Sequence, residues 1–154
     1  MKWIAKFLKA LGIFILAIAV LLVVSIWLLD YMSESHRKNY FQDRDRIERI
    51  TGVALPKFKM TNYSEGNRGL TGEYMDFIDF EFKNPLPDEL FDEIDVKIEE
   101  GNTGWSKEGN KYTFGQSWGN GIPAPKGESD DEDRFFYLTL VKGSKEGKIN
   151  HGVW

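Results

Sequence analysis

The sequence contains no cysteine and only two histidines among its 154 residues. Without cysteine the chain has no disulfide bond, no thiol nucleophile and no thiolate metal site. His36 and His151 lie far apart in the sequence, and neither stands in a spacing typical of zinc ligands or of a catalytic triad. We therefore expect no cofactor, and we expect a structural or exposed role for His151.

Clusters of basic residues with interleaved aromatics are also missing. Residues 53–154 carry 12 Lys or Arg against 19 Asp or Glu, a net charge of −7, whereas residues 1–52 carry 8 against 5, a net of +3. Neutralising nucleic-acid phosphates requires clustered Lys and Arg, so this charge distribution argues against nucleic acid as a partner.

One long apolar run is present, over residues 11–29, and it contains no charged residue. A helix of this length spans about 28 Å, close to the hydrocarbon thickness of a bilayer. The run is too long for the core of a signal peptide, and no Ala-x-Ala cleavage pattern follows it. Trp3, Trp27 and Tyr31 flank it, as expected for rings at the headgroup level. The sequence therefore predicts a retained single-pass helix, with the lipid bilayer as a partner.

Positive charge on both sides of this run bears on its orientation. The tail of residues 1–10 places Lys2, Lys6 and Lys9 next to the apolar edge. The competing positive charges after the run lie mostly more than a dozen residues from it: Arg37, Lys38, Arg44, Arg46 and Arg49. Proximity favours a cytoplasmic tail and a C-terminal domain in the periplasm or outside the cell.

Residues 30–52 are charged and contain no proline, and Gly52 is their first glycine. Asp45 and Arg49 stand four residues apart with the acid first, the better order for a helical pair. This pattern predicts a juxtamembrane helical stalk that ends at Gly52, with a short coiled coil or a lipid-binding basic helix as alternatives. A soluble domain would then cover residues 53–154.

Hydrophobic periodicity predicts the elements of that domain. The alternation of Ile78, Phe80 and Phe82 predicts a strand over residues 73–82, after a turn over residues 64–72. Prolines and acids at residues 85–89 begin a helix that we expect to end at Gly101. Shorter strands are expected over residues 53–63, around residues 112–114, and over residues 135–142 and 149–154. The order predicts an α+β fold, in which one helix packs on a small antiparallel sheet.

Two features of the domain suggest a surface for a protein partner. Aromatic residues around a Gly- and Pro-rich segment can form a ligand cleft, although we favour the hydrophobic core for most of these rings and expect Trp118 to be the most exposed. The acidic run over residues 128–133 lacks the spacing of a calcium loop and reads as a solvated loop. The candidate partner surface comprises Trp105, Trp118, Ile122, Asp130, Asp131 and Asp133.

Three segments carry a resemblance: Ile50-Thr51-Gly52-Val53-Ala54-Leu55-Pro56, Glu132-Asp133-Arg134-Phe135-Phe136 and His151-Gly152-Val153-Trp154. In these the chain is similar to small bacterial single-span membrane-anchored proteins that pair an N-terminal helix with one compact domain and carry no assigned activity. The resemblance implies a bacterial origin and this architecture. It implies no activity and no site residues.

The sequence therefore favours a membrane-anchored, non-catalytic binding or interaction domain. One alternative is an immunity or inhibitor protein whose acidic surface neutralises a basic partner. A second alternative is a hydrolase that uses carboxylates such as Asp76 and Asp79, which would require a pocket that holds both.

Overall fold

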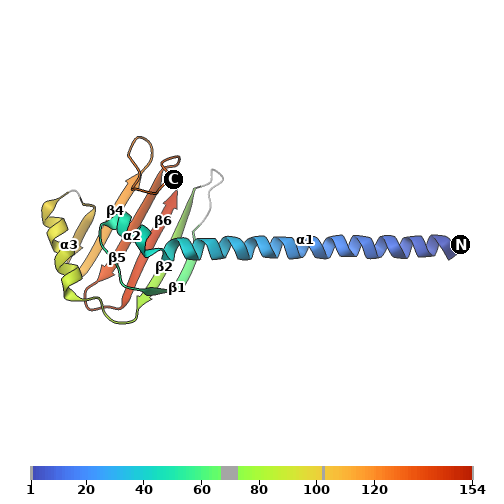
Figure 1. Cartoon of the computed structure of the whole chain (residues 1–154), viewed down its shortest axis with the longest axis horizontal. Coiled ribbons are helices and arrows are strands. Elements are labelled where there is room, and N and C mark those ends of the chain that lie inside the picture. Colours follow the sequence, from blue (N-terminus) through green and yellow to red (C-terminus); the bar gives the residue numbers. More distant parts are fainter. Residues whose placement is uncertain (1, 67–72, 102, 154) are drawn as a thin grey trace. The chain divides into compact units, whose positions relative to one another are not determined.

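The computed structural model describes residues 2–66, 73–101 and 103–153, and the chain divides into two units, Met1–Tyr40 and Phe41–Trp154 (Figure 1). Helix α1 (Lys2–Gln42) forms all of the described part of the first unit. Its segment Leu11–Leu29 is long and apolar enough to cross a membrane, and none of it is buried inside the protein. The N-terminal apolar helix expected from the sequence is therefore present.

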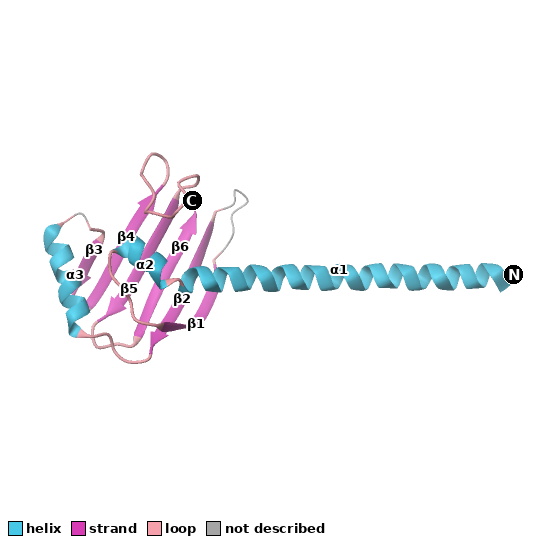
Figure 2. Ribbon diagram, in the orientation of Figure 1, coloured by secondary structure: helices cyan, strands magenta, loops and turns pink. Residues whose placement is uncertain are grey.

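The second unit has the predicted α+β fold, with six antiparallel strands in the order β1-β2-β6-β5-β4-β3 (Figure 2). The strands are β1 (Phe58–Glu65), β2 (Tyr74–Phe82), β3 (Trp105–Glu108), β4 (Lys111–Trp118), β5 (Arg134–Val141) and β6 (Glu146–Val153). The helices of this unit are α2 (Arg44–Thr51) and α3 (Asp88–Glu100). Most of the turn predicted for residues 64–72, and Trp154 in the last predicted strand, lie outside the described residues.

The last strand, β6, occupies a central place in the sheet. It pairs with β2 on one side and with β5 on the other, so Ile149 lies between Ile78 and Leu138. All three side chains are buried, because alternate residues of neighbouring strands point to the same face of the sheet. The centre of the core thus combines strands that are far apart in the sequence.

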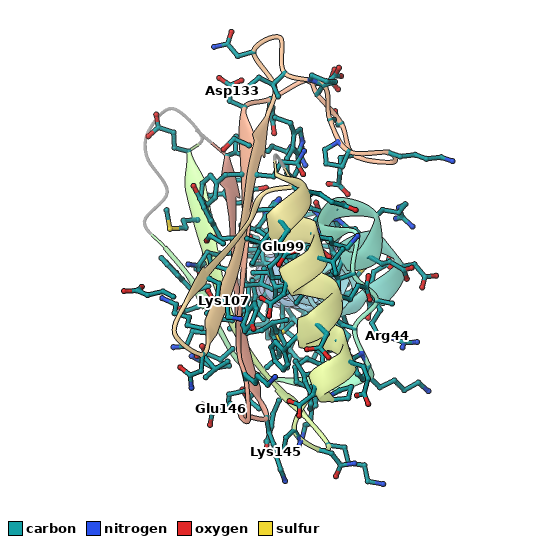
Figure 3. All side chains as sticks on the ribbon, turned by 90° about the vertical axis from the view of Figure 1, so that its left-hand side faces the viewer. Arg44, Glu99, Lys107, Asp133, Lys145 and Glu146 are labelled. Carbon is teal, nitrogen blue, oxygen red and sulfur yellow. The ribbon has the colours of Figure 1, made fainter. Side chains whose placement is uncertain are left out.

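Helices α2 and α3 pack on the same face of this sheet, which gives the unit two layers (Figure 3). On the α3 side, the rings of Phe91 and Tyr112 lie 4.9 Å apart. On the α2 side, the indole nitrogen of Trp105 donates a hydrogen bond to the carbonyl of Thr51 at 2.9 Å. The layer between helices and sheet is the hydrophobic core, and its largest fully buried side chains include Tyr112, Phe80, Phe91, Phe114, Phe136, Ile47, Ile78, Ile94 and Leu138.

The stalk predicted for residues 30–52 is interrupted, and its second half belongs to the compact unit. Asp43 has a non-helical backbone (φ −71°, ψ 97°), and its carboxylate accepts a hydrogen bond from the backbone N–H of Arg46, which starts a new helix. Ile47 and Ile50 are buried in the core, so the compact unit begins at Phe41 rather than at residue 53. The predicted end at Gly52 is confirmed, since this glycine adopts a left-handed conformation with φ 69°.

Candidate functional site

The sheet has a second face, which points away from α2 and α3 (Figure 3). Phe77 of β2 and Tyr137 of β5 lie on this open face, and each leaves 40% of its area exposed. Both residues pair with Asn150 of β6, which stands between them. The backbones of the two residues thus flank Asn150 near the middle of the sheet, whereas the Phe77 ring leans toward Gly66 and the Tyr137 ring lies over Gly115, away from Asn150.

Glycines fix the positions of the aromatic rings on the open face. A side chain at Gly115 would place its Cβ 2.7 Å from Cε1 of Tyr137, because this ring lies against the glycine across the β4–β5 pair. Gly152 gives the same room to Phe135, which is the neighbour of Tyr137 with ring centroids 5.7 Å apart. Packing against backbone leaves these rings little freedom to turn, so the open face is preorganised.

A polar groove of about 280 Å³ lies on β1, β2 and β6, where the register of β1 shifts between Met60 and Asn62. Nζ of Lys148 lies 3.4 Å from Oδ1 of Asp79, and the side-chain amide of Asn62 donates to Oδ2 of the same carboxylate at 3.3 Å. The polar residues that line the groove are Thr61, Asp79, Glu81, Glu146 and Lys148. The groove therefore offers acceptors and a donor, and one of its carboxylates is already paired.

The two tryptophans of the predicted partner surface are not on the surface. Trp105 is buried against α2, and only 1% of Trp118 is exposed. The indole nitrogen of Trp118 donates to the carbonyl of Ser129 at 3.0 Å, so this ring packs under the loop that follows it. The expectation of an exposed Trp118 is wrong, and the assignment of these rings to the core is confirmed.

The rest of that predicted surface lies on the loop between β4 and β5. Ile122 is 54% exposed, Asp130 and Asp131 are exposed, and Asp133 is partly buried. A buried ion pair holds this loop to α2: Nε and Nη2 of Arg46 lie 2.7 and 2.8 Å from the two carboxylate oxygens of Glu128. The three aspartates thus lie on a loop that this ion pair holds to α2. Within the described residues, no group of three or more histidine or acidic side chains is arranged to hold a metal ion.

His151 and Asp76 lie side by side in the core, on the face covered by the helices. Nδ1 of His151 is 4.0 Å from Oδ2 of Asp76, whose Oδ1 accepts a hydrogen bond from the Tyr63 hydroxyl at 2.7 Å. The Phe41 ring and the imidazole also form a T-shaped contact, with ring centroids 5.5 Å apart. Both polar side chains are buried, which fits the structural role expected for His151.

Burial is the main cause that lowers the pKa of His151 below 6.5, and the charges of Arg46 and Arg134 lower the pKa further, against the opposing effect of Asp76. The unfolded chain therefore binds a proton more readily than the folded one. We expect the free energy of unfolding to fall as the pH drops below about 6.5, by at most about 1.4 kcal/mol per pH unit from this group. Urea unfolding at pH 7.5, 6.5 and 5.5 measures this loss.

His151→Gln is the matched control for this pH dependence, because glutamine is neutral throughout the range. The difference in stability between wild type and variant should shrink as the pH falls. Parallel curves for the two proteins would show that His151 does not carry the effect.

The carboxylates considered for hydrolysis are not brought together. Asp76 and Asp79 are three residues apart on β2, so their side chains point to opposite faces of the sheet. Asp76 is buried beside Tyr63, whereas Asp79 lies on the open face beside Lys148. This pair cannot act on one substrate.

The sequence analysis did not predict the open face, although the sequence contains one signal for it. Phe77 interrupts the polar side of β2, where Asp79 and Glu81 follow it at alternate positions. Tyr137 occupies the matching face of β5. An aromatic residue on the polar side of an alternating strand is the signal in the sequence. That Phe77 and Tyr137 both pair with Asn150 depends on the strand order.

Comparison of the chain with protein-family models, with curated proteins and with solved structures finds no match. The interpretation of the open face therefore depends on the geometry and chemistry of the residues themselves.

Proposed function

We propose that this chain is a membrane-anchored, non-catalytic binding protein that uses the open face of its sheet to hold a ligand. The observation that carries the proposal is the pair of half-exposed rings, Phe77 and Tyr137, on the sheet face that lies opposite the helices. Aromatic side chains bury large areas on contact and contribute strongly to interface energetics, so two half-exposed rings on one sheet face support a binding role.

The anchoring part of the proposal comes from Leu11–Leu29, whose length and composition suit a membrane span. The basic tail of residues 1–10 favours the cytoplasmic side for the N-terminus. The folded unit, Phe41–Trp154, would then stand in the periplasm or outside the cell, where the open face meets its ligand.

The absence of cysteine from the sequence permits a test with single-cysteine variants. Ser117→Cys lies on the open face, where Ser117 pairs with Phe135, two residues from Tyr137, and Val96→Cys lies on the exposed side of α3. A membrane-impermeant maleimide should label Val96→Cys in intact cells if the domain is outside. It should label Ser117→Cys several-fold more slowly in intact cells than in the purified full-length protein, because bound ligand covers the open face.

Val96→Cys is also the control for the comparison of intact cells with the purified protein. Its labelling rate should be the same in both. A Val96→Cys variant that reacts only after the cells are permeabilised would refute the orientation. Equal rates for Ser117→Cys in cells and in the purified protein would refute a ligand-binding role for the open face.

A second candidate, inhibition of a basic partner, is supported by the loop that Arg46 and Glu128 fix in place. This loop presents Asp130 and Asp131 to solvent in a unit of negative net charge. Binding that weakens with salt and is lost in Asp130→Asn/Asp131→Asn, but not in Phe77→Ala, would favour this candidate.

A further inference from the structure

We infer that Asn120 is a modification site, at which the side-chain amide is lost by reaction with the backbone nitrogen of Gly121. The product is an aspartate or an isoaspartate, formed without an enzyme and with water as the only co-reactant. The site lies in the loop between β4 and β5 rather than on the open face, and it does not depend on the function proposed above.

Asn120 and Gly121 are the two central residues of a tight turn just after β4. The backbone N–H of Gly119 donates to the carbonyl of Ile122 at 2.9 Å, and the N–H of Ile122 donates to the carbonyl of Gly119 at 2.8 Å. Both central residues have positive φ, 49° for Asn120 and 91° for Gly121. This is a type I′ turn, for which asparagine followed by glycine is a preferred pair.

The positive φ of Asn120 brings the reacting atoms within one rotation of each other. The Gly121 nitrogen eclipses Cβ of Asn120 at a ψ of about −120°, the value that a type II′ turn has at its first central residue. That turn also has positive φ there, so rotation of the single peptide unit between Asn120 and Gly121 converts type I′ into type II′. The two hydrogen bonds that close the turn belong to Gly119 and Ile122, so they need not break. The turn thus keeps Cγ and its nucleophile close to a reactive arrangement.

The tip of the turn has room for this rotation, whereas its base is held. Asn120 and Gly121 are both exposed, and a Cβ at Gly121 would meet no heavy atom of the described residues within 4 Å beyond its chain neighbours. Gly119 at the base packs against the segment before β5. A Cβ there would lie 2.6 Å from the carbonyl oxygen of Glu132 and 2.8 Å from Cα of Asp133. The loop therefore presents the two reacting residues to solvent.

Glycine favours the attack, because it carries no side chain to hinder the backbone nitrogen. Asn120 is the only asparagine in the sequence that precedes a glycine. All other asparagines precede a residue with a side chain: Asn39, Asn62, Asn67, Asn84, Asn102, Asn110 and Asn150.

The reaction balances with water alone, and nothing is oxidised or reduced. The N–H of Gly121 gives its proton to water, and the nitrogen bonds to Cγ of Asn120 while the bond from Cγ to the side-chain nitrogen breaks. The leaving NH2 group takes a proton from water and departs as ammonia, so a five-membered succinimide ring remains. Water opens this ring at either carbonyl. Aspartate forms when the ring nitrogen separates from Cγ, and isoaspartate forms when it separates from the backbone carbon.

Either product changes the loop that carries the exposed acids Asp130 and Asp131. Both products add one negative charge two residues before Ile122. Isoaspartate also adds one carbon to the backbone, so a two-residue turn can no longer join Gly119 to Ile122. The modification therefore alters the charge of the loop and, in the isoaspartate form, its geometry.

The test follows the wild-type full chain in phosphatidylcholine nanodiscs at pH 8.5, by mass spectrometry of its proteolytic peptides. Exchange of the amide for a carboxylate raises the peptide mass, and fragmentation distinguishes isoaspartate from aspartate. We expect Asn120 to be converted at least about tenfold faster than Asn62, Asn110 and Asn150, because only its neighbour lacks a side chain. The rate in the folded chain should lie within about threefold of the rate in concentrated urea, because the turn already holds the reacting atoms close together.

Asn120→Gln is the matched control, because it keeps an amide at the position but would have to close a larger ring. The peptide with this substitution should keep its mass. Two results would overturn the inference: conversion of Asn120 no faster than that of the other three asparagines, or protection of Asn120 by about tenfold or more in the folded chain relative to urea. The second result would mean that the folded turn holds Cγ away from the Gly121 nitrogen.

Discussion

Arg46→Ala lowers the free energy of unfolding by about 3–5 kcal/mol, the cost expected when one partner of a buried ion pair is removed. The guanidinium bonds to both oxygens of Glu128, and both side chains are only 4% exposed. It also lies over the ring of Phe136, with its central carbon 5.8 Å from the ring centroid. The variant leaves the Glu128 carboxylate buried without this partner, and detaches the β4–β5 loop from α2.

Urea unfolding of the full chain, followed by tryptophan fluorescence, measures this loss. Arg49→Ala is the matched control on the same helix: its side chain is exposed, and the change should stay within about 0.5 kcal/mol. The double variant Arg46→Met/Glu128→Leu should regain most of the stability, because no charge remains buried. A double variant as unstable as Arg46→Ala would show that the ion pair itself, rather than the unpaired acid, determines the effect.

Trp118→Ala is expected to cost about 3–5 kcal/mol, since it removes one of the largest fully buried side chains of the protein. The same change deletes the hydrogen bond from the indole nitrogen to Ser129, which holds the loop over the ring. Trp118→Phe keeps most of the apolar volume and should cost less, because it loses mainly this hydrogen bond and part of the packing.

The control for Trp118 is Ile122→Ala in the loop that follows β4, where the side chain is 54% exposed and the change should be small. Chemical denaturation compares the three variants with wild type. A Trp118→Ala protein of wild-type stability would mean that the ring is on the surface, as the sequence analysis expected, and that the core lies elsewhere.

The sequence predicts the elements that carry a clear periodicity. The strand with Ile78, Phe80 and Phe82 and the helix that ends at Gly101 are both found in the structure, because each buries one regular face. Helix α2 was assigned to a stalk, since Ile47 and Ile50 are a sparse apolar signal among charged residues. Its burial depends on contacts with residues such as Trp105, which lies 54 residues further along the chain.

The candidate site was harder to predict because it also depends on contacts between residues that are far apart in the sequence. A Gly- and Pro-rich segment with a tryptophan suggests an exposed loop, but Trp118 is the last residue of β4 and its ring packs under the loop that follows, bonded to the carbonyl of Ser129. The exposed rings instead lie on strands, where Phe77 and Tyr137 become neighbours of Asn150 only after β6 enters between β2 and β5. Strand order is a tertiary property that local patterns do not encode.

The central place of β6 has a consequence for folding. Because β6 pairs with β2 on one side and with β5 on the other, the β1–β2 pair and the strands β3, β4 and β5 join into one sheet only once β6 is in place. A change that weakens the pairing of β6 therefore divides the sheet into two parts, each with an exposed strand edge.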